Sequence, residues 1–133
     1  MSVTGKVVLD SVSPEGVRLS TLQVRYPRMI HSELMTHRVF SRNGRSSRAV
    51  PVATLLKEKP YLPEFKLNRP GMVAGDRLEG EALKEANSLW LGLVEETKRV
   101  VARLNELKVH KEHANRPLEW FGYIDVLISS TDW

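Results

Sequence analysis

The chain has 133 residues, of which 41% are hydrophobic, and its 20 Lys and Arg against 16 Asp and Glu give a formal charge of +4. This length and composition argue against disorder and predict one globular domain over residues 1–133. Cysteine is absent, which excludes disulfides, thiolate metal sites and thiol nucleophiles and favours the cytoplasm. No segment approaches the roughly 20 apolar residues of a membrane span, so no membrane association is expected.

Two strands are predicted near the N-terminus. Residues 6–12 are rich in β-branched side chains, and the turn signal at residues 13–16 follows them. Residues 17–26 alternate apolar and polar side chains, but the apolar positions change parity near Ser20 and Thr21. This change predicts a bulge there or two different covering layers.

The next segment predicts a helix followed by a loop. Pro27 suits the first position of a helix, and Ile30 and Leu34 follow at helical spacing, which predicts a helix from Pro27 to residue 36 or 38. Residues 39–52 show no period and contain an Asn-Gly turn signal, so we expect an irregular loop there.

Residues 27–48 are also the most basic part of the chain. Between Gly16 and Lys57 the only acidic residue is Glu33. The arginines of this stretch are Arg28, Arg38, Arg42, Arg45 and Arg48. Guanidiniums among serine hydroxyls favour a phosphate-binding loop, and the alternative is a solvated cationic surface. The stretch is not a P-loop and has few aromatic side chains to stack on bases, which disfavours nucleic acid.

The second half of the chain predicts a scaffold. Residues 55–76 contain several prolines and glycines and predict an extended surface segment. Residues 77–109 carry a 3.6-residue apolar stripe and predict one long amphipathic helix. A short helix over residues 110–119 should end near Pro117.

Residues 123–130 read as a buried strand, with Ile124, Val126 and Ile128 on one side. Together these elements predict an α+β domain with an antiparallel or mixed sheet and a long scaffold helix.

The histidines do not predict a metal site. His110 and His113 share a helix face but belong to no HExxH motif, and His31 and His37 are six residues apart, which does not place them on one face.

The segment THRVFSRNGRSSRA resembles the signature of the flavin-dependent thymidylate synthases (ThyX), written RHRxxSxNExSxRY. The matching residues are His37, Arg38, Ser41, Asn43, Ser46 and Arg48. The similarity extends upstream to Ser13-Pro14 and downstream from His110 to Trp133, and a bacteriophage branch of the family looks closest.

The resemblance implies the ThyX-like fold and a specific reaction. The family methylates dUMP to dTMP with methylenetetrahydrofolate as carbon donor and NADPH as reductant of a bound FAD. It works as a homotetramer with active sites shared between subunits, here in the cytoplasm of a bacterial or phage-infected cell. The absence of cysteine agrees with this, because the other thymidylate synthase class needs a thiolate.

The resemblance also implies two sets of site residues, whose role would be charge neutralisation and positioning. The residues expected to contact FAD are Ser13, Thr36, His37, Arg38 and Asn43. The residues expected to bind the nucleotide are Glu33, Arg45, Ser46, Ser47, Arg48, Asn115 and Arg116. No catalytic residue is assigned, because the family's uracil-facing Arg would lie beyond Trp133.

The chain departs from the family motif at three positions, with Thr36 for Arg, Gly44 for Glu and Ala49 for Tyr. From its ending we expect the N-terminal portion of a longer family member. Two alternatives remain open at this stage. One is a truncated, non-catalytic flavin- or nucleotide-binding module, and the other is a nucleic-acid-binding fragment.

Overall fold

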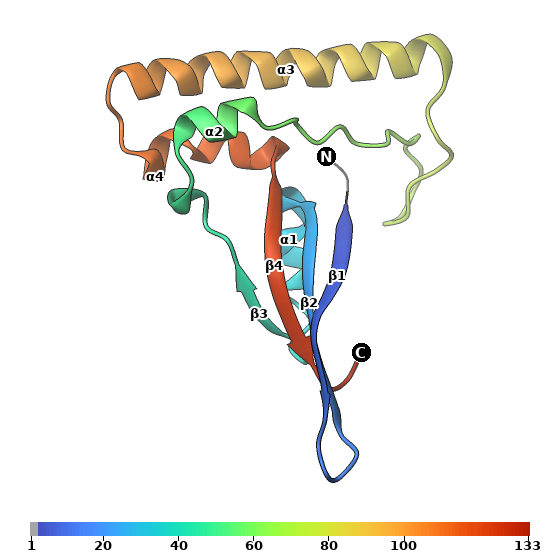
Figure 1. The fold of residues 1–133 in the computed structure, drawn as a ribbon. Coiled ribbons are helices and arrows are strands. Elements are labelled where there is room, and N and C mark those ends of the chain that lie inside the picture. The colour runs from blue at the N-terminus through green and yellow to red at the C-terminus, as the bar shows by residue number, and fades with distance from the viewer. Residues whose placement is uncertain (1–2) are drawn as a thin grey trace.

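The computed structural model describes residues 3–133 and is organised around a four-stranded antiparallel sheet with strand order β1-β2-β4-β3 (Figure 1). The strands are β1 (Thr4–Val12), β2 (Arg18–Pro27), β3 (Ser41–Gly44) and β4 (Tyr123–Ser130). The sheet and the long helix described next confirm the expected α+β class.

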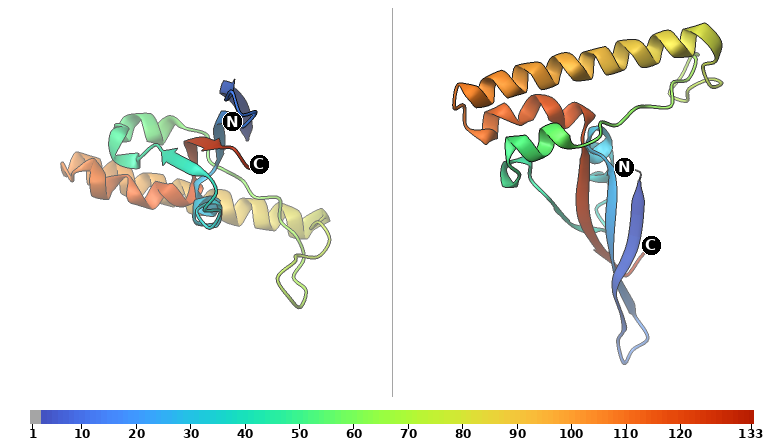
Figure 2. Two further views of the ribbon diagram at one scale, coloured as in Figure 1. Left: turned by 90° about the horizontal axis from the view of Figure 1, so that it is seen from below. Right: turned by 45° about the horizontal axis from the view of Figure 1, so that its top comes forward.

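The longest element is helix α3, which runs across one end of the sheet (Figures 1 and 2). The helices are α1 (His31–Leu34), α2 (Val52–Lys57), α3 (Gly80–Glu106) and α4 (Lys111–Ala114). Short 3-10 turns are η1 (Arg28–Ile30), η2 (Ser47–Ala49) and η3 (Arg116–Phe121). Between residues 3 and 133, no helix combines the length and apolar character that crossing a membrane requires.

One face of the sheet forms the first core. Ile124, Val126 and Ile128 of β4 are buried, as their alternation predicted, and pair in register with the apolar side of β2. The side chains of Leu34 and Phe40 pack against this face. The segment after β2 is therefore held against the sheet by apolar burial.

The second core lies between α3 and the shorter helices. Val101 of α3 is fully buried against Val52, Ala114 and Leu118. This contact confirms that the apolar stripe of the long helix serves as scaffold. It also holds α2, α4 and η3 between α3 and the sheet (Figure 2).

The segment between α2 and α3 is extended, as predicted, and hydrogen bonds fix it along the long helix. The indole Nε1 of Trp90 donates to the Tyr61 carbonyl at 2.9 Å, and Tyr61 N donates to the Phe121 carbonyl at 2.7 Å. The Phe65 and Phe121 rings meet Trp90 edge-on.

The predicted bulge near Ser20 and Thr21 is in the partner strand instead. The register shifts between Val7 and Leu9, so the extra residue belongs to β1. β2 continues without interruption, and Leu19 stays exposed on the side away from the sheet core. Val17 and Leu19, the apolar side chains before the parity change, are both exposed, so the structure shows no second covering layer over them.

Four other boundaries differ from the sequence prediction. Helix α2 occupies the start of the segment 55–76 that was predicted to be extended. The segment predicted as an irregular loop contains β3, which pairs with β4 from Ser41 to Gly44. This pairing at the sheet edge satisfies backbone N–H and C=O groups, and it leaves no periodic pattern in the side chains. The helix after Pro27 is shorter and ends at Leu34. Pro117 lies at the start of η3, where its missing N–H is not needed, instead of ending a helix.

Truncation at Ile124 tests the first core. Ile124→Ala should lower the free energy of unfolding by about 2–5 kcal/mol. The Ile124 side chain is only 2% exposed, so its truncation leaves a cavity in the core. Leu127→Ala, on the exposed side of the same strand, should lower it by less than about 1 kcal/mol. Urea unfolding measures both values, and equal losses would contradict the described register.

Candidate functional site

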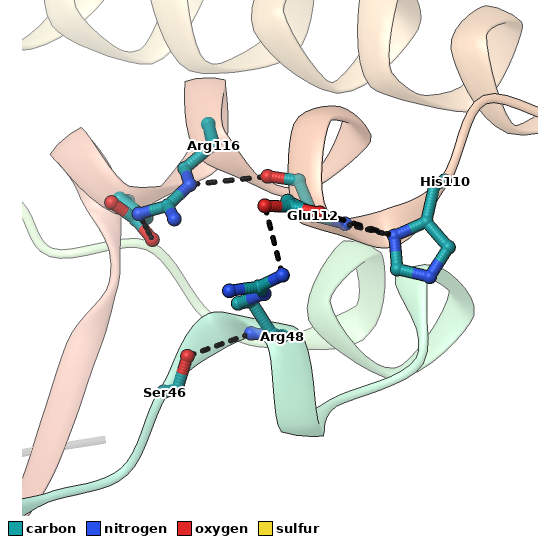
Figure 3. A network of polar contacts seen from close by, with 6 residues as sticks. Ser46, Arg48, His110, Glu112 and Arg116 are labelled. Carbon is teal, nitrogen blue, oxygen red and sulfur yellow. Dashed lines mark hydrogen bonds and ion pairs between the residues drawn. The ribbon is translucent and has the colours of Figure 1, made fainter.

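The basic loop meets the C-terminal helices through a set of polar contacts that Figure 3 shows. Arg48 reaches from η2 to α4, where its Nη2 lies 2.8 Å from Glu112 Oε1. The backbone N–H of Arg48 donates to Ser46 Oγ at 3.2 Å, and Arg116 Nε donates to the Glu112 carbonyl at 3.1 Å. Three expected nucleotide-binding residues, Ser46, Arg48 and Arg116, are thus brought together.

Asn115 holds this arrangement from the inside. Its side chain is fully buried, and its Nδ2 donates to the Val50 carbonyl at 2.8 Å. Arg116 beside it is exposed and lies 3.4 Å from Glu119. Asn115 therefore holds the loop that ends at Val50 in place, and Arg116 presents an exposed positive charge. Ser47 belongs to η2, but its side chain lies outside the described part of the chain.

A small cavity of about 40 Å³ lies on the inner side of Ser46. Two arginines line it, Arg45 from the loop after β3 and Arg28 from η1, and Arg28 Nη2 donates to the Arg45 carbonyl at 2.9 Å. Arg28 belongs to neither set of expected site residues. The sequence places Arg28 in the basic stretch and near the start of a predicted helix. Neither feature predicts that its side chain lines a cavity.

Arg28 is an electrostatically strained cation. Burial is the largest influence that lowers the pKa of its guanidinium, and the charges of Arg45 and Arg116 lower it further. The carboxylate of Glu119 acts in the opposite direction. A bound anion would act in the same direction as Glu119 and favour the charged form of Arg28.

The residues expected to contact the flavin are divided between separate places in one chain. Thr36, His37 and Arg38 follow α1 and are exposed. Thr36 Oγ1 donates to the Glu33 carbonyl at 2.7 Å. Glu33 and His37 also line a groove on the α1 side of the sheet. The apolar walls of this groove include Val24, Tyr26, Ile30, Leu34 and Ile128.

Asn43 and Ser13 lie elsewhere. Asn43 pairs with Leu127 on the opposite face of the sheet. Ser13 is in the hairpin turn, where its Oγ accepts from Val17 N at 3.2 Å. Because the pairing of β2 with β4 ends at Ser20, this hairpin projects past the sheet (Figure 1). Within one chain, neither residue reaches the groove beside His37.

Gly44, which stands where the family has Glu, lies close to the sheet core. A Cβ at this position would be 3.2 Å from Ile124 Cδ1 and 3.7 Å from His31 Cε1. The small residue therefore allows β3 and the His31 ring to approach each other. The departure from the motif has a packing cause.

His31 and Tyr26 form a hydrogen bond beside Gly44, with 2.5 Å between the Tyr26 hydroxyl and His31 Nδ1. Burial, and then the charges of Arg28 and Arg42, lower the pKa of His31. Burial raises the pKa of Tyr26. Both groups are therefore neutral at neutral pH, and the more acidic phenol donates to the imidazole, which leaves the proton of the ring on Nε2.

The arrangement around Ser46 can bind and orient an anion. Its groups are guanidiniums, a hydroxyl and backbone N–H donors, which suit phosphate oxygens. In the part of the chain that the structure describes, no three His, Asp or Glu side chains are grouped to hold a metal ion.

Comparison with known proteins identifies the fold. No protein-family model and no curated protein matches the chain. Two solved structures that share the fold are of the UMP/dUMP methylase PolB from Streptomyces cacaoi, one bound with 5-Br UMP and the other with 5-Br dUMP. Each has a TM-score of 0.74 and 18% sequence identity, and the alignments cover 97% of this chain and 71% or 72% of PolB. The fold is thus the ThyX-like fold that the signature implied.

The His31 ring should titrate below its ordinary pKa of 6.5. The unfolded chain then takes up this proton at a higher pH than the folded chain. The free energy of unfolding should therefore fall as the pH is lowered through about 6.5 toward the folded-state pKa. An NMR titration of the ring Cε1–H gives the pKa, and urea unfolding at about pH 7.5 and about pH 5.5 gives the stability.

His31→Gln should make the stability less dependent on pH over this range. His113→Gln, at an exposed position of α4, is the matched control and should leave the dependence unchanged. A His31 midpoint at or above 6.5 would contradict the assignment.

Proposed function

We propose that this protein binds dUMP and acts as a flavin-dependent thymidylate synthase, converting dUMP to dTMP with methylenetetrahydrofolate, FAD and NADPH. The observation that carries the proposal is the meeting of Ser46, Arg48 and Arg116 at one anion-binding place. The fold shared with a UMP/dUMP methylase supports a nucleotide substrate. On this proposal the chain is a ThyX protein of the bacteriophage type.

The residues beside His37 fit part of a flavin. A groove with apolar walls and a polar rim at Glu33 and His37 suits a flat aromatic ring with hydrogen-bonding edges. When bound, FAD would supply the hydride chemistry that no side chain can provide. Ser13 and Asn43 would then have to contact FAD from another copy, which agrees with the homotetramer and shared sites that the resemblance implies.

The chain's own residues would bind and orient the nucleotide. The hydroxyl of Ser46 would donate a hydrogen bond to the phosphate, and the guanidiniums of Arg48 and Arg116 would neutralise its charge. Holding the phosphate in this way would fix the position of the uracil ring. Glu112 already pairs with Arg48 at 2.8 Å, so phosphate binding competes with this carboxylate.

Two measurements test the proposal. Purified protein should show the visible absorbance of bound flavin after addition of FAD. A flavin-loaded sample should release tritium from dUMP labelled at C5 when NADPH and methylenetetrahydrofolate are present. A folded, flavin-loaded sample without tritium release would contradict the enzymatic part. A protein that binds neither FAD nor dUMP would contradict the whole proposal.

Removing the Arg48 guanidinium should weaken dUMP binding. For Arg48→Ala we expect a loss of roughly 1.5–3 kcal/mol, the range for a hydrogen bond to a charged group. Isothermal titration calorimetry measures this loss. Arg103→Ala, which removes an exposed arginine of α3 paired with Glu106, is the control and should not change the affinity. Unchanged dUMP affinity in Arg48→Ala would refute the assignment.

Neutralising the competing carboxylate should act in the opposite direction. Glu112→Gln releases Arg48 from an exposed ion pair, so dUMP should bind more tightly by about 0.2–1 kcal/mol. Glu106→Gln, which breaks the corresponding pair on α3, should have no effect. Weaker dUMP binding in Glu112→Gln would mean that Glu112 positions Arg48 instead of competing for it.

A further inference from the structure

A cationic recess lies beside the end of α2, apart from the place where the nucleotide phosphate is proposed to bind. Its lining consists of Arg25 of β2, Thr54 and Lys57 of α2, and Glu58 and Lys59 after that helix. The recess has a volume of about 360 Å³, which is within the range of small-molecule sites. Among the described residues, none of those expected to contact the flavin or the nucleotide lines it.

The recess carries an excess of positive charge. Glu58 is the carboxylate of its lining, and this side chain lies 3.7 Å from the guanidinium of Arg45, which is outside the lining. Lys57 and Lys59 are exposed, and no carboxylate of residues 3–133 forms an ion pair with either of them. These two positive charges are therefore available to an anionic ligand.

Arg25 forms the buried end of the recess. Its side chain is 11% exposed, its Nη1 donates to Asp125 Oδ2 at 2.7 Å, and its guanidinium lies 5.2 Å from the centre of the Tyr123 ring. Its Nε–H is also buried, but in the described part of the chain it has no hydrogen-bond partner. A buried donor requires a water or a ligand oxygen, so this Nε distinguishes the recess from a merely solvated cationic surface.

The lining indicates the kind of group that the recess can hold. Ammonium groups on flexible stems and a threonine hydroxyl suit carboxylate oxygens without imposing one fixed orientation. None of the described lining residues is aromatic, so a base or a flavin ring has no surface to stack on. The recess therefore suits the charged end of a ligand whose ring lies elsewhere.

The position of the recess relates it to the nucleotide. Glu58 and Lys59 line both this recess and the cavity on the inner side of Ser46. A ligand in the recess would therefore lie beside the bound nucleotide. On the proposed function, the molecule that must reach the nucleotide is methylenetetrahydrofolate, whose far end is a glutamate with two carboxylates.

We propose that this recess binds the glutamate tail of the folate substrate, with Arg25 at its buried end and Lys57 and Lys59 at its rim. The carboxylates of the tail would supply the oxygens that the Arg25 Nε–H and the two ammonium groups lack. Further glutamates of a polyglutamate tail would find the same positive charge at the rim. The identification of the ligand as a folate rests on the proposed function, whereas the dicarboxylate site does not.

Calorimetric titrations of the whole chain test the proposal with four probes. They are p-aminobenzoylglutamate, which is the tail half of folate, its triglutamate form, p-aminobenzamide, which lacks the carboxylates, and the adenosine bisphosphate half of NADPH. The unchanged protein should bind p-aminobenzoylglutamate saturably, bind the triglutamate form more tightly, and bind p-aminobenzamide more weakly than either.

Lys57→Gln should bind p-aminobenzoylglutamate about twofold to fivefold more weakly, because one exposed charge contributes a modest free energy. Arg25→Lys keeps a positive charge beside Asp125 and removes the Nε donor, so it should also bind this probe more weakly. Lys84→Gln, at an exposed position of α3 paired with Glu81, is the matched control and should bind it as before. Lys57→Gln should keep the dUMP affinity of the unchanged protein.

The outcomes separate this inference from the proposed function. If Lys57→Gln weakens p-aminobenzoylglutamate binding but the flavin-loaded protein does not bind methylenetetrahydrofolate, the recess stands and only the proposed function fails. Absent binding of p-aminobenzoylglutamate to the unchanged protein, or equal binding to Lys57→Gln, overturns the inference. Equal affinity for p-aminobenzamide does so as well.

Two further results bear on the identity of the ligand and on the variants. If the adenosine bisphosphate binds more tightly than the triglutamate probe and Lys57→Gln weakens that binding, the assignment to the folate tail is overturned in favour of the reductant. If Arg25→Lys fails to fold by circular dichroism, Lys57→Gln decides alone, because its side chain is exposed and its replacement should not affect folding.

Discussion

The buried hydrogen bond from Asn115 Nδ2 to the Val50 carbonyl is the contact on which the candidate site depends. It joins the end of the basic loop to the start of η3, two segments 65 residues apart in the chain. An unsatisfied buried amide would be costly, so the bond holds the loop in one position. Ser46 and Arg48 on one side, and Glu112 and Arg116 on the other, face each other because of it.

The loop position that the Asn115–Val50 hydrogen bond fixes also brings several arginines close together. Folding partly buries Arg28, which lowers the pKa of its guanidinium, and it brings Arg45 and Arg116 near enough to lower that pKa further, whereas the carboxylate of Glu119 raises it. Self-repulsion among fixed cations reduces stability, and an anion that binds the folded state alone would restore it. On the proposed function, the free energy gained when a phosphate compensates these cations would favour a phosphorylated substrate over an unphosphorylated one.

The distribution of the expected flavin contacts shows how a sheet separates residues that are near in sequence. His37 and Asn43 are six residues apart, yet one lies in the groove on the α1 side and the other beside Leu127 on the opposite face. His37 lies between α1 and β3, whereas Asn43 lies within β3 and pairs with Leu127, so the chain changes direction and structure within the motif and the motif does not indicate a single surface. An oligomer in which neighbouring copies complete each groove would reconcile the motif with this geometry.

The sequence by itself determined the α+β class, the long helix, the alternation of β4 and the concentration of arginines in residues 27–48, because these follow from local periodicity and composition. It also indicated that Ser46, Arg48 and Arg116 belong to one site, through the resemblance to a family motif. Only the tertiary structure decided that β3 pairs with β4, that the bulge lies in β1, and that Pro117 begins η3. The inward position of Arg28 and the role of Asn115 as a clamp were likewise decided there. The physical reason is that burial and pairing depend on segments distant in the chain, and no local pattern records which segments will meet.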